Sequence, residues 1–294
     1  MALYSMTGYG RAAAQGKGLR ATAEIQSVNR KHLDIQISAP PALNAWSPEI
    51  QKSVAGAVHR GRVAVSIDLQ WTDAARAASV RVDKAAASAY CEALREAAKS
   101  LGMDAALRAE TLLRIPGLVS SEPPALDSEE HRAVVFRAVE KALRALQRMR
   151  KKEGAELERD LRERLDELSS IADSIRERAP EIPKRRRRIL EQKLAEAGVD
   201  AGVGGDALAR EMVLFADRSD VSEELTRLDV HMGAFRKRMR GGSPAGRELD
   251  FLAQELHREI NTTGSKANDA ECAGGVVRFK TELEKVREQV QNIE

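Results

Sequence analysis

The chain has 294 residues, more than one hydrophobic core usually organises, so we expect two compact domains. Charged residues make up 32% and aromatic residues only 3%, a composition that is typical of long solvated helices and argues against a β-sandwich or a barrel. The formal net charge of +3 gives only slight support to a polyanionic partner, so the local distribution of charge is more informative.

The cysteines and the first residues indicate the compartment. Cys91 and Cys272 are far apart and belong to no CxxC pair, so neither a disulfide framework nor a zinc knuckle is predicted. The opening MALYSMTGYG lacks the basic and apolar regions of a signal peptide, and no apolar run approaches the roughly 20 residues that span a bilayer. We therefore expect a soluble, cytoplasmic protein with no membrane partner.

Alternating hydrophobic residues predict three strands in the first part of the chain. The clearest alternation covers residues 63–71, a second covers 33–37, and a weaker one covers 21–25. The weaker strand is expected to form a hairpin that turns near Asn29. The two glycines of SMTGYG, at positions 8 and 10, predict a turn.

Helix signals lie between and after these strands. The tripeptide SPE at 47–49 supplies an N-cap, a proline at the first helical position and an early acid, which predicts a helix over 48–59 and the order β-β-α-β. A second helix is expected from residue 84 to about 101. A proline-containing loop between 115 and 124 follows, and helix resumes at about Ser128.

A long amphipathic helix is predicted in the middle of the chain. Hydrophobic residues recur at three- and four-residue spacing from Leu157 to Ile175, and the helix is expected to stop near Pro180 and Pro183. The run KRRRR at 184–188 comes next. It is either a solvated helix face or a phosphate-binding cluster, because guanidinium groups match phosphate oxygens.

The last part of the chain is predicted to be all-helical after a glycine-containing loop at 198–205. Helices are expected over 220–239 and 246–266. From Val276 to Ile293 the hydrophobic positions alternate between three and four residues apart, a seam that requires another helix, most simply one of the same chain.

The predicted fold class is therefore α+β with helix dominant. We expect an N-terminal α+β domain over 1–150, a helical arm that carries the basic run over 151–204, and an all-helical C-terminal domain over 205–294.

The segment 246–266 holds the densest chemistry. At about 100° per residue, one side of this helix carries a polar row. The row is Asp250, Gln254, His257 and Asn261. Glu255 and Glu259 occupy a separate flank, so one helix cannot direct all of these carboxylates at a single atom. Another helix must complete any site that they share.

The preceding helix offers a carboxylate and an imidazole at the edge of its hydrophobic stripe. Glu224 and His231 lie seven residues apart there. Partial desolvation shifts the pKa values of such groups and suits acid–base or metal-ligand chemistry. A histidine at a stripe edge is also a common structural residue, so both interpretations remain open.

No GxxxxGK[ST], HExxH, GxSxG or Rossmann glycine pattern is present, which argues against P-loop, zincin and serine-hydrolase sites. Seven stretches instead resemble, in order, the signatures of the YicC/YloC family. They are SMTGYG at 5–10, SVNRKHLD at 27–34, HRGRV at 59–63, RIPGLV at 114–119, EELTRLDVHMGAF at 223–235, GRELDFLAQELHREINTTGSKA at 246–267 and VREQVQNIE at 286–294.

The resemblance covers nearly the whole chain and implies a bacterial cytoplasmic endoribonuclease that assembles as a hexamer and closes around RNA. It also implies an N-terminal α+β part, a helical middle and a helical C-terminal domain. His257 stands where the family block commonly has asparagine, so no shared catalytic role is expected for it.

Two routes of RNA cleavage are compatible with these residues. Hydrolysis assisted by Mg²⁺ or Mn²⁺ needs hard oxygen ligands, for which Asp250, Glu255 and Glu259 are the expected set. The other route uses the RNA 2′-hydroxyl as nucleophile, with an acid–base pair and a cation. We favour the metal route because carboxylates outnumber histidines in the matched blocks. The expected catalytic residues over both routes are Glu224, His231, Asp250, Glu255, Arg258 and Glu259, with Lys266 as a second candidate cation.

RNA is expected to be held mainly through its phosphates, because few aromatic residues are available to stack on bases. The expected RNA-binding residues are Arg30, Arg62, Arg185, Arg186, Arg187, Arg247 and Lys266. Two other classes remain open: an RNA-binding adaptor that delivers transcripts to another nuclease, and a structural helical oligomer. Of the three classes, only a structural oligomer is expected to show no salt-dependent RNA binding.

Overall fold

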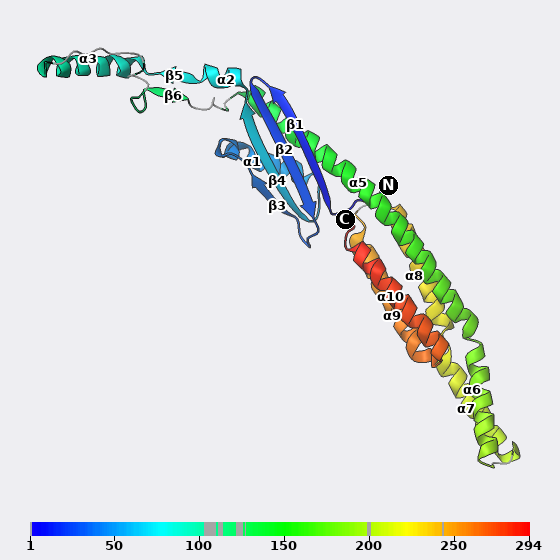
Figure 1. The fold of residues 1–294 in the computed structure, drawn as a ribbon. Helices are drawn as coiled ribbons and strands as arrows, with labels where there is room; N and C mark the ends of the chain where they lie inside the picture. The colour runs from blue at the N-terminus through cyan, green and yellow to red at the C-terminus, as the bar shows by residue number, and fades with distance from the viewer. Residues whose placement is uncertain are drawn as a thin grey trace.

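The computed structural model describes residues 2–102, 110, 114–121, 126, 128–198, 201–242 and 244–294. The molecule is elongated, and a single long helix, α5 (Glu129–Arg178), runs from a small β-sheet into a bundle of helices (Figure 1). The predicted helix-dominant α+β fold is confirmed.

The described elements before α5 include both strands and helices, and every described element after α5 is a helix. The strands are β1 (Gly8–Gly16), β2 (Leu19–Val28), β3 (Asp34–Ser38), β4 (Arg62–Trp71), β5 (Val80–Val82) and β6 (Val119–Ser121). The helices before α5 are η1 (Pro41–Trp46), α1 (Ser47–Ala55), α2 (Asp73–Ala78) and α3 (Lys84–Ser100). Those after it are α6 (Glu181–Glu196), α7 (Ala201–Ser219), α8 (Ser222–Arg240), α9 (Gly246–Ala267) and α10 (Ala270–Val290).

The main sheet has the strand order β1-β2-β4-β3. β2 pairs antiparallel with both β1 and β4, and β3 pairs parallel with β4. The expected hairpin around Asn29 is therefore wrong, because β2 and β3 do not pair. The chain passes from β3 through η1 and α1 before it enters β4, and such a crossover is what a parallel pair requires.

β1 corrects the prediction for the start of the chain. Gly8 and Gly10 lie in a strand rather than in a turn, and a Cβ added to Gly10 would lie 2.2 Å from the carbonyl oxygen of Ala142 in α5. Glycine is needed there because the helix backbone lies directly on the strand. The strand sequence GYGRAAAQG has no run of large aliphatic residues, so it shows no alternation to detect.

α5 begins and ends close to the residues that the sequence predicts. The helix starts at Glu129, close to the predicted start at Ser128, and the hydroxyl oxygen of Ser128 caps the first turn by accepting a hydrogen bond from the N–H of His131 (3.1 Å). The helix ends at Arg178, and Pro180 then caps α6. Pro183 does not stop a helix, because it lies in the first turn of α6, where no earlier carbonyl is lost.

Two predicted loops need correction. The loop expected over 198–205 is helical from Ala201 onward, since α7 begins there. Residues 119–121 lie in the loop expected between 115 and 124, but they form β6, which pairs with β5. The Pro123-Pro124 pair falls outside the described residues. The domain boundaries at 150 and 204 stay predictions, and α5 is unbroken at residue 150.

Two hydrophobic cores share α5. The first half of α5 packs on the sheet, where alternate residues of β2 such as Leu19 and Ile25 are fully buried. The second half packs with α8, α9 and α10 around Phe235, Leu256 and Phe279. The seam of α10 thus packs within the same chain, as expected, against α5 and α9. Among the described residues, no helix is long and apolar enough to cross a bilayer.

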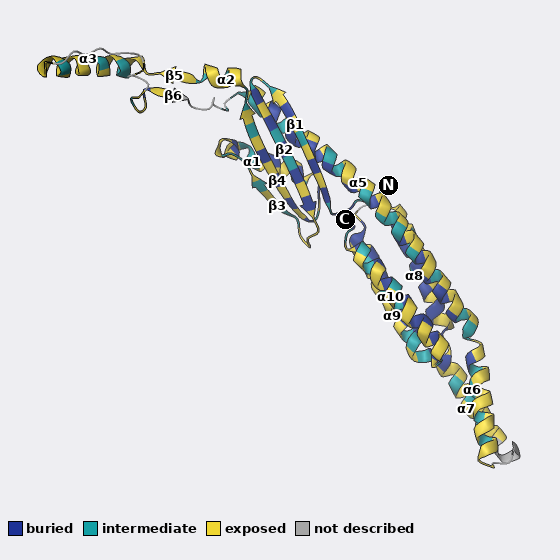
Figure 2. Ribbon diagram, viewed as in Figure 1, coloured by how far each residue is buried: buried dark blue, intermediate teal, exposed yellow. Residues whose placement is uncertain are grey.

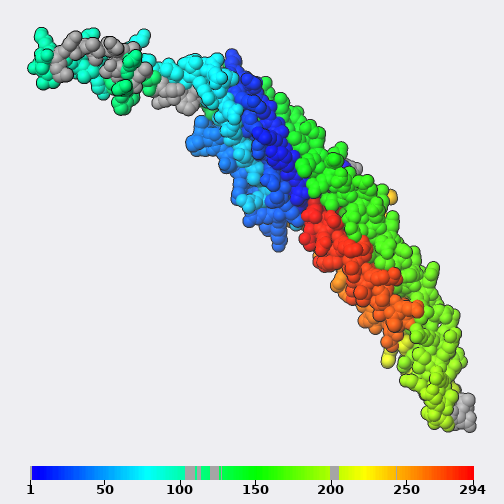
Figure 3. Space-filling view, in the orientation of Figure 1, coloured from blue at the N-terminus to red at the C-terminus, as the bar shows by residue number. Residues whose placement is uncertain are grey.

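A buried ion pair connects the two cores, at a junction that we call the joint (Arg150, Ser5, His59, Ala245 and Glu294). Arg150 is 1% exposed; its Nε donates to the carbonyl oxygen of Ser5 (2.6 Å) and its Nη2 to Oε2 of Glu294 (2.6 Å). Oε1 of Glu294 accepts from the backbone N–H of His59 (2.7 Å), and its main-chain oxygen accepts from Ala245 (2.8 Å). Figure 3 shows the C-terminal residues packed between the sheet and α5.

Replacing Arg150 by Met should lower the free energy of unfolding by about 3–5 kcal/mol, because the carboxylate of Glu294 loses its buried counter-ion. Urea unfolding of the full chain measures this loss. The matched control is Arg144→Met, which removes an exposed arginine of the same helix and should cost far less. Equal losses in the two variants would contradict the structural role of the joint.

Candidate functional site

The candidate site lies where α8 packs against α9. α8 buries Leu228, Met232 and Phe235, and α9 buries Leu249, Leu256 and Ile260, in the core of the helical bundle. With these stripes in contact, the polar residues at the edges of the two stripes come together along the line between the helices. Two ion-pair systems and one group of metal-ligating side chains lie on this line.

The group that could hold a metal consists of His231, Glu255 and Glu259. One ligand atom of each lies within 4.8 Å of the other two. Glu255 and Glu259 are one helical turn apart on α9, and His231 comes from α8. Glu259 is 4% exposed and the other two are half-buried. The second helix that any shared site requires is therefore α8.

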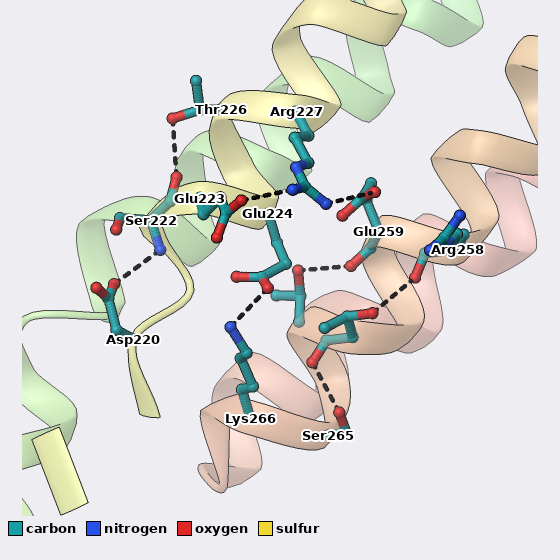
Figure 4. A network of polar contacts seen from close by, with 12 residues as sticks. Asp220, Ser222, Glu223, Glu224, Thr226, Arg227, Arg258, Glu259, Ser265 and Lys266 are labelled. Carbon is teal, nitrogen blue, oxygen red and sulfur yellow. Dashed lines mark hydrogen bonds and ion pairs between the residues drawn. The ribbon is translucent and has the colours of Figure 1, made fainter. Parts of the chain in front are cut away.

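Arg227 supplies the positive charge beside the buried Glu259. Its Nη1 lies 3.6 Å from Oε1 of Glu259, and its Nη2 donates to Oε1 of Glu223 (2.5 Å), so it links the two helices (Figure 4). Sequence reasoning did not single out this residue. The available signal was its spacing, since Arg227 lies four residues after Glu223 and four before His231, on the same side of α8.

Glu224 and Lys266 form a second pair beside the first. The carboxylate of Glu224 is largely buried, and its Oε1 accepts a hydrogen bond from Nζ of Lys266 at 2.6 Å (Figure 4). The hydrogen bond that Lys266 donates to Glu224 is the main cause that raises the pKa of Lys266 above its ordinary value. Oε2 of Glu224 is buried without a hydrogen-bond partner among the described residues.

The other candidates on α9 lie apart from the metal-ligand group. Asp250 accepts a hydrogen bond from Gln254 (2.9 Å) and is not a member of that group. His257 contacts Asn261 (3.0 Å) on the exposed polar row. Arg258 is exposed beside Glu259, where it is accessible to a large ligand.

The donor set fits a divalent ion. One imidazole nitrogen and two carboxylate oxygens suit Mn²⁺ better than Mg²⁺, because Mg²⁺ prefers oxygen ligands alone. The burial of Glu259 strengthens the case, since a buried carboxylate needs a nearby positive charge. Arg227 supplies that charge only from 3.6 Å, beyond the distance of a close hydrogen bond, so an additional cation would improve the compensation.

Most of the expected RNA-binding residues already have partners within the chain. These are Arg30 with Asp34, Arg62 with Gln36, Arg185 with Asp269, Arg186 over the ring of Phe215, Arg187 with Glu191 and Lys266 with Glu224. Arg247 is the exception: its side chain has no ion pair or hydrogen bond within the described residues. The basic run of α6 is thus in large part neutralised locally.

Comparisons with known proteins cover nearly the whole chain. The family models described as "Endoribonuclease YicC-like, N-terminal region" and "Endoribonuclease YicC-like, C-terminal" match residues 3–159 and 175–294. A protein of Clostridioides difficile strain 630 named "Probable endoribonuclease YicC" is 31% identical over 291 residues, which is 99% of each chain. A protein of the same name from Haemophilus influenzae is 29% identical over 292 residues, 99% of this chain and 100% of the relative.

Replacing Lys266 by Met should lower the free energy of unfolding by about 1–3 kcal/mol, because the buried carboxylate of Glu224 loses its only hydrogen-bond donor among the described residues. Adding Glu224→Gln to this variant should restore part of the loss. Thermal unfolding of the two variants and of Lys184→Met, which breaks an exposed pair, provides the comparison. If Lys266→Met is as stable as the control Lys184→Met, the pair of Lys266 and Glu224 is structurally unimportant.

Asp269 gives a pH-dependent prediction at the turn that follows α9. Burial alone would raise its pKa, but the N–H groups of Cys272 and Glu271 and the guanidinium of Arg178 together hold the pKa below its ordinary value. A lowered pKa means that the charge stabilises the fold above about pH 3.9, and that this contribution is lost as the pH falls through the folded-state pKa.

Asp269→Asn should therefore destabilise the protein by about 1–2 kcal/mol at pH 7, with a smaller difference from wild type near pH 3.5. Urea unfolding at both pH values tests the trend. Asp173→Asn, at an exposed position of α5, serves as the control and should show a small difference at either pH. A loss for Asp269→Asn that stays constant over this pH range would refute the role of its charge.

Proposed function

The chain belongs to the YicC-like endoribonuclease family, and from this premise we propose that it cuts RNA at phosphodiester bonds, with His231, Glu255 and Glu259 as the centre of a divalent-metal-dependent cleavage site. The observation that carries the proposal is the meeting of these three side chains, from two helices, with their ligand atoms within 4.8 Å of one another.

The residues of this centre have complementary tasks. Glu255 and Glu259 supply negative charge and His231 supplies a nitrogen ligand, and the contact with Arg227 orients the buried carboxylate of Glu259. When bound, Mn²⁺ or Mg²⁺ acts as a Lewis acid and lowers the pKa of a coordinated water. Asp250 is not part of the proposed group, because it lies on the separate polar row.

Cationic side chains around the centre suit a phosphodiester substrate. Arg227 lies beside Glu259 and Lys266 beside Glu224 where α8 meets α9, while Arg258 points to the other side of α9 (Figure 4). Arg227 and Arg258 are exposed, and Lys266 is about one-third exposed, so all three can approach a phosphate from solvent. Positive groups fixed near the scissile bond stabilise the negative charge that develops on the phosphate during cleavage.

We propose in addition that copies of the chain assemble, as a hexameric ring or clamp, around RNA in the cytoplasm. The family resemblance is the main support. A second support is the segment that contains α2, β5 and α3, which is largely exposed (Figure 2). α3 has no buried residue, and Val80, Val82 and Tyr90 expose about half of their surface. Apolar side chains without a core of their own are typical of a partner interface.

The test of the function is cleavage of an end-labelled structured RNA by the purified full chain in Mn²⁺, Mg²⁺ or EDTA. Wild type should cut only with metal. Glu259→Gln should lower the rate by at least about 100-fold, because loss of one ligand typically lowers metal affinity or activity steeply. The control Glu284→Gln changes an exposed carboxylate of α10 and should retain the wild-type rate.

Every variant should first be shown to have the wild-type oligomer mass and RNA affinity. Cleavage that persists in EDTA would favour attack by the 2′-hydroxyl, with His231 as acid or base. Salt-dependent RNA binding by wild type without cleavage under any condition would contradict the nuclease proposal and favour an RNA-binding adaptor.

A further inference from the structure

A second cationic site lies at the joint, at the start of α9, whereas the proposed cleavage centre lies near the middle of that helix. A cleft of about 330 Å³ opens there between the sheet end of the molecule and the helical bundle. Its lining comes from three places: residues 31–33 between β2 and β3, residues 59–60 before β4, and residues 244–248 at the start of α9, together with Glu294. The volume suits a ligand of nucleotide size.

The charge in this cleft is positive and uncompensated. Lys31, Arg60 and Arg247 line it, and none of the three side chains has an ion pair or hydrogen bond within the part of the chain that the structure describes. The Nε atom of Arg60 is buried and has no hydrogen-bond partner among the residues that the structure describes. A buried donor without an acceptor is costly, so an incoming acceptor is favoured.

The two carboxylates of the lining do not cancel this charge. Oε2 of Glu294 already pairs with Arg150 at 2.6 Å, and Oε2 of Glu248 pairs with Arg238 at 2.6 Å. Both of these arginines lie outside the lining. Three cations therefore face the cleft without a counter-ion, which is the arrangement that binds an anion.

The cleft is held open by fixed backbone. The N–H of His59 donates to Oε1 of Glu294 (2.7 Å), and the carbonyl oxygen of Gly61 accepts from the N–H of Asp34 (3.0 Å). Gly61 has φ +107°, and an added Cβ would lie 2.8 Å from the carbonyl oxygen of Val28, so glycine is required at this position. Arg60 is thus positioned between two tied residues before any ligand arrives.

Apolar groups beside the cations favour a nucleotide over a bare inorganic anion. Leu33, Pro244 and Ala245 contribute to the same lining, next to Arg247. A cleft with convergent cations and a partly apolar wall matches a phosphate that is attached to a sugar and a base.

We propose that this cleft binds a nucleoside phosphate and serves as an RNA-anchoring subsite separate from the cleavage centre; the anchoring role rests on the proposed nuclease function. At about 1.5 Å per residue, Arg247 lies roughly 12–18 Å along α9 from Glu255 and Glu259. A strand anchored at its phosphate in the cleft can therefore extend along α9 to the metal-ligand group.

Calorimetric titration of the full-length protein with adenosine 5′-monophosphate, inorganic phosphate and adenosine tests the site. The monophosphate should bind best, inorganic phosphate more weakly, and adenosine not measurably. Arg247→Gln and Arg60→Gln should each weaken monophosphate binding about tenfold, the effect of losing one charge-assisted contact. The control Arg278→Gln removes an exposed arginine of α10 that also has no partner within the described residues, and it should bind like wild type.

Binding of adenosine as tight as that of the monophosphate, or unchanged binding in Arg247→Gln and Arg60→Gln, would overturn the proposal. Two RNA oligonucleotides of one sequence, with and without a 5′-phosphate, then identify the source of the phosphate in EDTA. A loss of affinity in Arg247→Gln for the phosphorylated RNA alone supports a terminal phosphate, and an equal loss for both supports an internal one.

The assay separates this inference from the nuclease proposal, because adenosine 5′-monophosphate contains no phosphodiester bond to cut. Arg247-dependent binding in a protein that never cleaves RNA would leave the subsite in place and refute the nuclease. Metal-dependent cleavage by a protein that does not bind the monophosphate would do the reverse.

Discussion

The buried pair of Arg150 and Glu294 is the interaction on which the arrangement of the molecule depends. It joins the middle of α5 to the end of the chain, while Glu294 also binds the backbone of His59 and Ala245. A buried ion pair gives little net stability by itself, but it is costly to break, so it fixes one geometry. Through it the loops of the sheet are held against the start of α9, which is what forms the cationic cleft.

Close backbone approaches reinforce this joint. A Cβ on Gly154 would lie 2.2 Å from the carbonyl oxygen of Leu3, and one on Gly246 would lie 2.3 Å from that of Ile293. The terminal QNIE and the opening SMTGYG, which look unrelated in sequence, thus meet in one structural unit with α5. The same α9 that starts at the joint carries Glu255 and Glu259 further along. One rigid helix therefore sets the distance between the proposed anchor and the proposed cleavage centre.

Local patterns in the sequence predict much of the architecture. Three strands, the start of α5 near Ser128 and the last two helices followed from alternation, helix-start signals and hydrophobic spacing. β1 was missed because its alanines and glycines carry no alternation, although contact with α5 selects them. The predicted hairpin of β2 with β3 is wrong because the chain crosses over through α1 and places β4 between these two strands. The residues next to a strand in the sequence do not indicate such a crossover.

The candidate site was predictable in composition but not in arrangement. The helical wheel separated Asp250 from Glu255 and Glu259, and it showed that a second helix was required. It could not show that His231 faces the two glutamates, or that Arg227 lies beside Glu259, because both depend on how α8 packs against α9. Buried charges that cost stability and have a single cationic neighbour are typical of functional sites.

The most direct test of the central claim is anomalous diffraction from crystals of the full chain soaked in Mn²⁺, with data collected at the manganese absorption edge. The account predicts a peak within bonding distance of His231, Glu255 and Glu259. A peak at Asp250 instead, or none between α8 and α9 at saturating Mn²⁺, would contradict it.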